Sequence, residues 1–299
     1  GKATADIRND IHKFILILKI LTVYLPIMWE NIQLNRMLAD HLPDISGRQI
    51  VLLTGARQTG KTTLVKKHYQ SIPYFNLDAM EYRDQLRSIS TFRWAKEVGA
   101  AVIDEIQKEP GLFDKIKYCY DDGSLNFSVI TGSSQILLLK KIQETLAGRV
   151  SLRELFPYML GELIAPETLK TESVVFEKMI NAANFDDFFE SLDSVLMGQA
   201  LDIAVRAEKW LNIWGGMAPL IHLTQPDQKR FWLKDYAIAY LERDLTDLAK
   251  LTDLKPFRRF QQIAALRTAN LISFTELAKD SGIGIETARR YLEYLRISY

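Results

Sequence analysis

The feature that most constrains this chain is the pattern G-x-x-x-x-G-K-T, which begins at Gly55 and ends at Thr62. It directly follows an apolar run at residues 50–53 and precedes a segment of helical character. The two glycines permit backbone angles that a Cβ resists, so successive N–H groups can point inward at phosphate oxygens. A helix that follows adds unpaired donors and the positive end of its dipole. In this context the pattern predicts a phosphate-binding loop.

The residue types of the loop predict which part of a bound nucleotide each residue contacts. Lys61 is placed to meet the β- and γ-phosphates, and the Thr62 hydroxyl to ligate Mg²⁺. Thr63 can donate to the α-phosphate, whereas Arg57 either touches the γ-phosphate or forms a surface ion pair. The predicted nucleotide contacts are Gly55, Ala56, Arg57, Gln58, Thr59, Gly60, Lys61, Thr62 and Thr63.

A second apolar run, at residues 100–103, ends in the carboxylates of Asp104 and Glu105. Such a pair by itself is equally typical of a turn at the end of a strand. Downstream of a phosphate loop in one sheet, the functional interpretation is favoured. Asp104 is then a Mg²⁺ ligand, direct or through water, and Glu105 orients or deprotonates the attacking water.

Two further catalytic candidates, Ser133 and Arg149, rest on weaker patterns. Ser133 lies just after the apolar run at residues 127–130. Its hydroxyl, or that of Ser134, either holds the attacking water or senses which nucleotide is bound, or else the two residues cap a helix that begins near Gln135. Arg149 follows Gly148 at the end of that helix. Its guanidinium either stabilises charge on the γ-phosphate, within the chain or on a neighbour, or answers the helix dipole.

The order of apolar runs predicts an α/β fold for the first half of the chain. Runs at residues 50–53, 74–77, 101–103, 127–130 and 149–155 alternate with helical stretches, including residues 61–69 and 135–146. This alternation is typical of a parallel sheet sandwiched by helices. After Pro157 the apolar spacing becomes helical. We therefore divide the chain into an N-terminal helical segment (1–45), a core (46–160), a helical extension (161–254) and a C-terminal unit (255–299).

The C-terminal unit predicts a helix-turn-helix, read as a partial winged helix. It carries eight basic and four acidic residues. Ser273 or Thr275 caps the first helix, which covers residues 274–279, and Gly282 fits the turn before a helix over residues 285–295. On that second helix two residues are expected to face the core, Leu292 and Leu295. Four are expected to lie outward or partly so: Thr287, Arg289, Arg290 and Tyr291.

Overall composition excludes several classes of protein. Lys and Arg number 38 against 37 Asp and Glu, which leaves a net charge of +1 and no global field toward nucleic acid or membrane. The single cysteine, Cys119, cannot form an internal disulfide, which fits a cytoplasmic protein. The apolar segment at residues 14–29 is shorter than the roughly 20 residues that span a bilayer. Membrane insertion is therefore not expected.

Taken together, these residues resemble a family of bacterial and archaeal AAA-type ATPases with a C-terminal domain of unknown function. The resemblance rests on residues 52–62, 103–107, 131–133, 146–149, 215–217 and 240–244, in that order. It implies a P-loop NTPase core with an additional strand, in which residues 127–131 lie between the strands that lead to Lys61 and Asp104. It also implies ATP rather than GTP. In the family the glycine pair is closely followed by an aromatic or apolar residue and then proline, whereas in this chain Ala218 intervenes before Pro219. Family members also continue past the position of Tyr299.

The expected function is Mg²⁺-dependent ATP binding and hydrolysis that drives a conformational switch. One alternative is a nucleotide-gated DNA-binding regulator with negligible turnover. Another is a protein-interaction scaffold that nucleotide merely stabilises. Possible partners besides ATP are further copies of the chain, and DNA or protein at the C-terminal unit. Arg243, between Glu242 and Asp244, is either a second phosphate contact or part of an ion-pair network.

Overall fold

The computed structural model describes residues 34–132, 146, 148–164, 175–192, 199–238 and 253–298. The chain forms two compact units, each of which is treated by itself: one holds residues 157–232 with the segment before residue 38, and the other holds residues 38–156 and 233–299. Several sequence-based predictions lie outside the described residues: the apolar segment 14–29, the helix over 135–145, the roles of Ser133 and Ser134, and the cluster at 242–244. Within the described residues, no helix is both long and apolar enough to cross a membrane.

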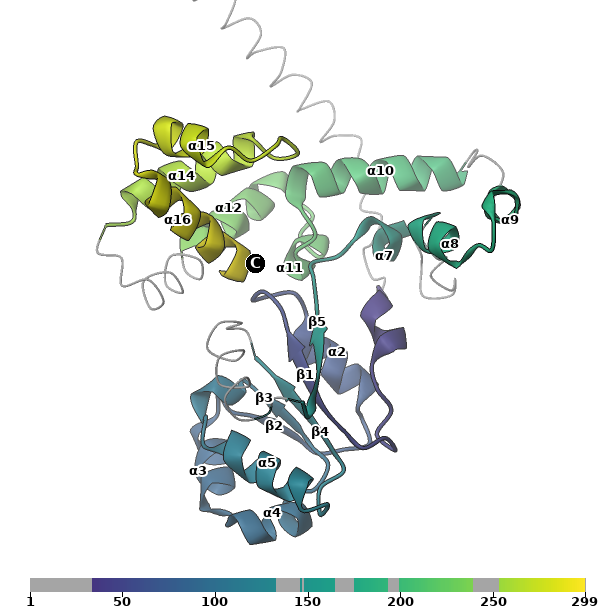
Figure 1. Ribbon diagram of the computed structural model, residues 1–299, viewed down its shortest axis with the longest axis vertical. Coiled ribbons are helices and arrows are strands. Elements are labelled where there is room, and N and C mark those ends of the chain that lie inside the picture. The colour runs from purple at the N-terminus through teal and green to yellow at the C-terminus, as the bar shows by residue number, and fades with distance from the viewer. Residues whose placement is uncertain are drawn as a thin grey trace, which may run out of the picture. The chain divides into compact units, whose positions relative to one another are not determined.

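The second unit is built on a five-stranded sheet in the order β2-β3-β4-β1-β5 (Figure 1). Every neighbouring pair of strands is parallel. The strand that precedes Ser133 therefore lies between the strands that lead to Lys61 and to Asp104, and the predicted α/β fold with an additional strand is confirmed. The strands are β1 (Gln49–Thr54), β2 (Tyr74–Asn76), β3 (Val102–Asp104), β4 (Phe127–Thr131) and β5 (Val150–Glu154).

Strand β1 shows why the sequence runs are continuously apolar. Its side chains alternate between the two faces, and both faces are buried, so consecutive positions must all be hydrophobic. Ile50 and Leu52 join a cluster completed by helices α3 (Met80–Ser88), α4 (Thr91–Glu97) and α5 (Leu112–Asp121). Val51 and Leu53 join a second cluster that includes Leu64 and Val65 of α2 (Lys61–His68). The sheet is thus sandwiched between helical layers.

The C-terminal part of this unit is a three-helix cluster of α14 (Lys255–Leu266), α15 (Phe274–Ser281) and α16 (Ile285–Ser298). Ser273 caps α15 by accepting a hydrogen bond from the Glu276 N–H, and Gly282 ends it in the left-handed conformation. The expectation that Tyr291 lies outward is wrong. Its ring packs edge-on against Phe257 and Phe260 of α14, and only 4% of Tyr291 is exposed. An aromatic residue on α16 is drawn inward because α14 supplies two aromatic partners.

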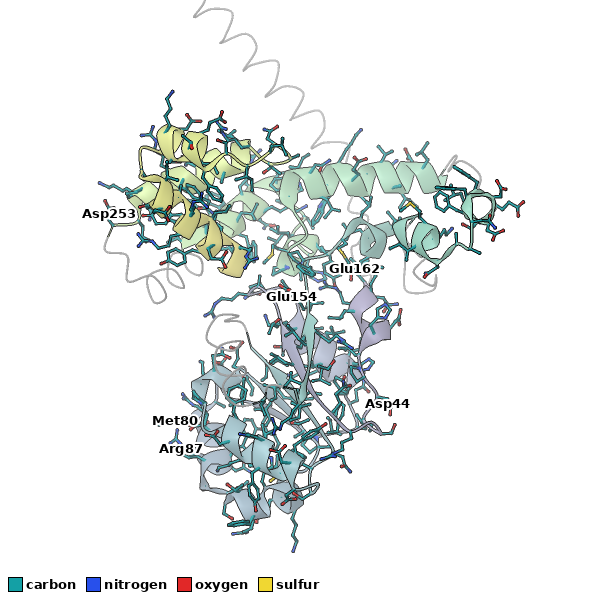
Figure 2. All side chains as sticks on the ribbon, viewed as in Figure 1. Asp44, Met80, Arg87, Glu154, Glu162 and Asp253 are labelled. Atoms are coloured by element: carbon teal, nitrogen blue, oxygen red, sulfur yellow. The ribbon has the colours of Figure 1, made fainter. Side chains whose placement is uncertain are left out.

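The remaining short or helical elements are η1 (Met37–His41), η2 (Ile106–Lys108), α7 (Leu160–Ile164), α8 (Val175–Asn181), α9 (Phe185–Ser191), α10 (Gln199–Trp214), α11 (Ala218–Ile221) and α12 (Pro226–Tyr236). In the first unit, Glu162 of α7, labelled in Figure 2, is buried and accepts a hydrogen bond from the Arg36 guanidinium at 3.1 Å. The same carboxylate accepts from the Met37 and Met159 N–H groups. This network ties the segment before residue 38 to α7.

The two glycines that follow α10, Gly215 and Gly216, are needed for different structural reasons. Gly215 has a φ of 73°, a left-handed conformation that ends the helix. A Cβ on Gly216 would stand 2.1 Å from the Tyr158 carbonyl oxygen, so only glycine allows this approach. Pro219 lies in the first turn of α11, where its missing N–H costs nothing. Ala218 is therefore accommodated as the start of a helix.

Candidate nucleotide site

The phosphate loop connects β1 to α2 and has the backbone that its glycines predict. Gly55 has a φ of 142° and Gly60 a φ of 97°, and Gln58 is also left-handed at 63°. At Gly55 a Cβ would stand 2.3 Å from the carbonyl oxygen of Leu155, which follows β5. Glycine is thus required there both by the backbone angle and by the close approach of another chain segment.

Lys61 lies inside the loop, and only 6% of it is exposed. Its ammonium donates to the Gly55 and Ala56 carbonyl oxygens at 2.9 and 2.8 Å. The Thr59 hydroxyl also donates to the Ala56 carbonyl, at 2.9 Å. Burial lowers the pKa of Lys61 to about 8, against the opposing attraction of the Glu105 and Asp104 carboxylates. A buried cation whose ammonium donates to loop carbonyls is well suited to receive an anionic phosphate.

Asp104 lies at the end of β3, is 2% exposed, and receives hydrogen bonds from several elements. Its Oδ2 accepts from the Thr62 hydroxyl at 2.7 Å and from the Tyr74 hydroxyl at 2.6 Å. Its Oδ1 accepts from the Thr131 hydroxyl and, at 3.1 Å, from the Glu105 N–H. The sheet therefore brings the loop, β2, β3 and β4 to a single carboxylate.

Glu105, the predicted water-activating residue, follows Asp104 at the turn into η2. Its φ of 59° is rare for a residue with a side chain, and such strain is characteristic of functional positions. The carboxylate is half-buried and accepts a hydrogen bond from the Gln107 side-chain amide. The amide oxygen of Gln107 is buried and has no hydrogen-bond partner within the described part of the chain. Gln107 thus fixes the direction of the Glu105 carboxylate.

The donor set fits a magnesium ion that arrives with nucleotide phosphates. Mg²⁺ prefers oxygen ligands and is usually held by one or two protein groups together with substrate phosphates and water. The Thr62 hydroxyl and the Asp104 carboxylate provide this set, already 2.7 Å apart. These two residues would hold the ion, which would neutralise charge on the β- and γ-phosphates.

The other predicted contacts of the loop are placed as follows. Ala56 is buried, and its carbonyl is an acceptor for Lys61. Arg57 offers its carbonyl to the Tyr236 hydroxyl at 3.2 Å. Gln58 and Thr63 are exposed, the latter in the first turn of α2. The loop residues, Thr62 and Asp104 are therefore gathered at one edge of the sheet, together with Glu105.

Arg149 is not brought to this edge within the chain. It precedes β5, and the parallel register pairs Val150 with Ile50, at the start of β1. The phosphate loop follows the other end of β1, so Arg149 lies at the opposite edge of the sheet. There it forms an ion pair with Asp121, at the end of α5, at 2.5 Å. A contact with a γ-phosphate bound to the same chain does not follow from this geometry, and a role toward a neighbouring copy stays a prediction.

Sequence reasoning missed three side chains that the structure brings to the site: Tyr74, Thr131 and Gln107. Thr131 lies within the family-like stretch at residues 131–133, and its hydroxyl donates from the end of β4 to Asp104. Tyr74 opened a predicted strand, but nothing local marks it as a neighbour of Asp104. Gln107 lies two positions after Glu105, and that proximity was the available signal.

Comparison with known proteins agrees with this site. Residues 47–164 match a family model described as an AAA domain, and residues 208–299 match a domain of unknown function, DUF8612. The chain is 28% identical over 248 residues to uncharacterized proteins of Mycobacterium bovis and Mycobacterium tuberculosis, a match that covers 82% of this chain and 47% of theirs. An uncharacterized protein of Methanocaldococcus jannaschii is 24% identical over 268 residues, with coverage of 84% and 55%. The chain thus spans about half the length of these curated relatives.

Solved structures with a similar arrangement include a Walker-type ATPase of Pyrococcus abyssi. It is 16% identical, with a TM-score of 0.41 and coverage of 83% of this chain and 84% of the other. A signal-transduction ATPase with numerous domains from Pyrococcus horikoshii, which has a tetratricopeptide repeat sensor, is 13% identical. Its TM-score is 0.30, and the match covers 89% of this chain and 52% of the other.

Proposed function

We propose that this chain binds ATP with Mg²⁺ and hydrolyses it, because residues 47–164 match a family model described as an AAA domain and form the phosphate site described above. The observation that carries the proposal is the bond between the Thr62 hydroxyl and the buried Asp104 carboxylate, beside the buried Lys61 ammonium. This arrangement joins a phosphate-binding cation to an oxygen pair suited to Mg²⁺. It is assembled from two segments of the chain that lie 42 positions apart in sequence, and a turn that is only structural does not require this contact.

The proposed roles follow from the atoms that each residue presents. Lys61 would exchange its carbonyl acceptors for β- and γ-phosphate oxygens, and Thr62 and Asp104 would hold the ion, which would neutralise phosphate charge. Glu105 accepts a proton from the attacking water or orients it toward the γ-phosphate. The exchange of partners at Lys61 alters the loop itself, and we propose this local change as the first step of the nucleotide-driven switch.

The decisive experiment is steady-state ATP hydrolysis with Mg²⁺ for the wild-type chain and for Glu105→Gln. The substitution keeps the shape of the side chain and removes its capacity to accept a proton, so turnover should fall about 100-fold or more while ATP affinity stays within threefold. Glu81→Gln on α3, an exposed glutamate of the same unit, is the matched control and should leave both quantities unchanged.

Other results would point elsewhere. Equal loss of binding and turnover in Glu105→Gln would contradict the division of labour between Glu105 and the phosphate loop. ATP binding without any wild-type turnover would remove hydrolysis from the proposal. It would then favour the nucleotide-gated regulator or the nucleotide-stabilised scaffold.

For the C-terminal helices we propose a protein contact or an intramolecular role in preference to DNA binding. Two arginines on α16 that a groove-binding helix would use are already balanced one turn away. Arg289 pairs with Glu286 at 3.6 Å, and Arg296 pairs with Glu293 at 2.9 Å. Each phosphate contact uses a Lys or Arg, and the acidic partners one turn away reduce the positive potential of this surface toward duplex DNA. Association with further copies, with Arg149 acting on a neighbour, and a cytoplasmic location remain part of the proposal.

A further inference from the structure

The carboxylate of Asp104 has all its acceptor positions filled. An ionised carboxylate offers about four lone-pair sites, two on each oxygen. Oδ2 accepts from the Thr62 and Tyr74 hydroxyls, and Oδ1 accepts from the Thr131 hydroxyl and the Glu105 N–H. A metal ion that bound this carboxylate directly would have to displace one of these donors.

Tyr74 reaches Asp104 because of the register between two neighbouring strands. The parallel pairing of β2 with β3 aligns Tyr74 with Val102 and Asn76 with Asp104. Tyr74 and Asn76 are two positions apart, so their side chains share a face of the sheet with those of Val102 and Asp104. A tyrosine is long enough to extend from its own level to the strand end. Lys66 of α2 lies over its ring, with the ammonium 4.2 Å from the ring centre.

We propose that Tyr74 is a positioning residue that makes Asp104 an outer-sphere anchor for Mg²⁺. The Tyr74 hydroxyl occupies the second acceptor site of Oδ2, and the first site receives the proton of Thr62. Asp104 would then hold the Thr62 hydroxyl in place and contact the ion through water. This inference rests on the proposed ATP and Mg²⁺ site.

The choice of outer-sphere contact has a consequence for ion selectivity. Mg²⁺ dehydrates reluctantly and keeps several waters, whereas Ca²⁺ takes more oxygen ligands at longer distances. A carboxylate held by four donors suits the hydrated Mg²⁺ ion. If Tyr74 is replaced by phenylalanine, one lone pair of Oδ2 is released and becomes available to a larger ion. Tyr74→Phe should therefore weaken the preference for Mg²⁺ over Ca²⁺.

The test is calorimetric titration of ATP into the full chain in Mg²⁺, in Ca²⁺ and in excess chelator, for wild type, Tyr74→Phe and Tyr69→Phe. Tyr69→Phe is the matched control, because the Tyr69 hydroxyl donates to the Pro43 carbonyl at 2.9 Å and, among the residues that the structure describes, does not contact Asp104. We expect Tyr74→Phe to reduce the ratio of Mg²⁺ to Ca²⁺ enhancement of ATP affinity by about tenfold, the scale of one hydrogen bond to a charged group.

In chelator, Tyr74→Phe should bind ATP within twofold of wild type, and Tyr69→Phe should retain the wild-type ion preference while melting at a lower temperature. An unchanged ion preference in Tyr74→Phe overturns the inference. So does an equal loss of ATP affinity with and without metal, which would indicate damage to the loop. If the wild-type chain itself gains no ATP affinity from Mg²⁺, the proposed function fails, and that result precedes any comparison of variants.

Discussion

Replacement of Gly55 by alanine should disable the phosphate loop, and the expected cost can be worked out from two observations. The new Cβ would stand 2.3 Å from the Leu155 carbonyl oxygen, and the backbone φ of 142° is one that L-residues rarely adopt. The backbone strain costs about 1 to 3 kcal/mol. Overpacking against a neighbouring backbone adds about 1 to 3 kcal/mol. The free energy of unfolding should fall by about 2 to 6 kcal/mol, or the loop must move.

Gly123→Ala separates the two contributions. Gly123 also has a positive φ, 83°, but nothing lies within 4 Å of a Cβ built there. It should lose only about 1 to 2 kcal/mol and keep its ATP affinity. At about 2 to 4 °C per kcal/mol, thermal melting should drop by about 4 to 24 °C for Gly55→Ala. Calorimetric ATP titration of both variants completes the assay. Equal melting temperatures, or full ATP affinity in Gly55→Ala, would refute the reasoning.

Two further predictions concern charged residues. Burial lowers the pKa of Lys61 to about 8, whereas the unfolded chain keeps this proton to near 10.5. Between about pH 8 and pH 10.5 the unfolded chain binds more protons at Lys61 than the folded chain does. The free energy of unfolding of the nucleotide-free chain should therefore rise with pH over this range. Because neutral Lys61 attracts phosphate less, ATP affinity should fall over the same range, with proton uptake measurable by calorimetry in buffers of different ionisation enthalpy. Arg149→Ala should keep ATP affinity within twofold of wild type. Any loss of turnover should appear only at protein concentrations where copies of the chain associate. A loss of turnover at high dilution would contradict the position of Arg149 at the far edge of the sheet.

The parts of the fold that the sequence predicts are those encoded locally. Strand β1 is a short apolar run because both its faces are buried, and the loop after it is defined by the glycines that its backbone requires. The positions of Asp104 and Glu105 are predictable for the same reason, because the two residues come directly after a second short apolar run. The position of β4 between β1 and β3 came from the family resemblance instead, since no local pattern in a sequence states which strands are neighbours.

The parts that could not be predicted depend on register and on distant partners. Tyr74 and Asp104 are thirty positions apart in sequence. They meet because the register of β2 and β3 aligns Asn76 with Asp104, which places Tyr74 on the same face of the sheet. Tyr291 is buried because α14 carries two aromatic residues that receive it. The position of Arg149 could have been predicted from the sequence. In a parallel sheet, a residue that precedes a strand lies at the opposite edge from a loop that follows a strand.

The chemistry of the site explains why Asp104 is surrounded by hydroxyl groups. A buried carboxylate is costly unless its acceptor sites are filled, and a lysine or arginine partner would fill them while cancelling its charge. Within the described part of the chain, the donors to Asp104 are instead three hydroxyls and one N–H, all neutral. Lys61 lies nearby but donates to loop carbonyls. The carboxylate is thus stabilised in the folded chain while its negative charge is preserved, and the charge of the lysine is likewise left for the phosphates. The nucleotide-free chain thus presents the Lys61 ammonium and the Asp104 carboxylate at the same end of the sheet. The ammonium is complementary to the nucleotide phosphates, and the carboxylate is complementary to the magnesium ion.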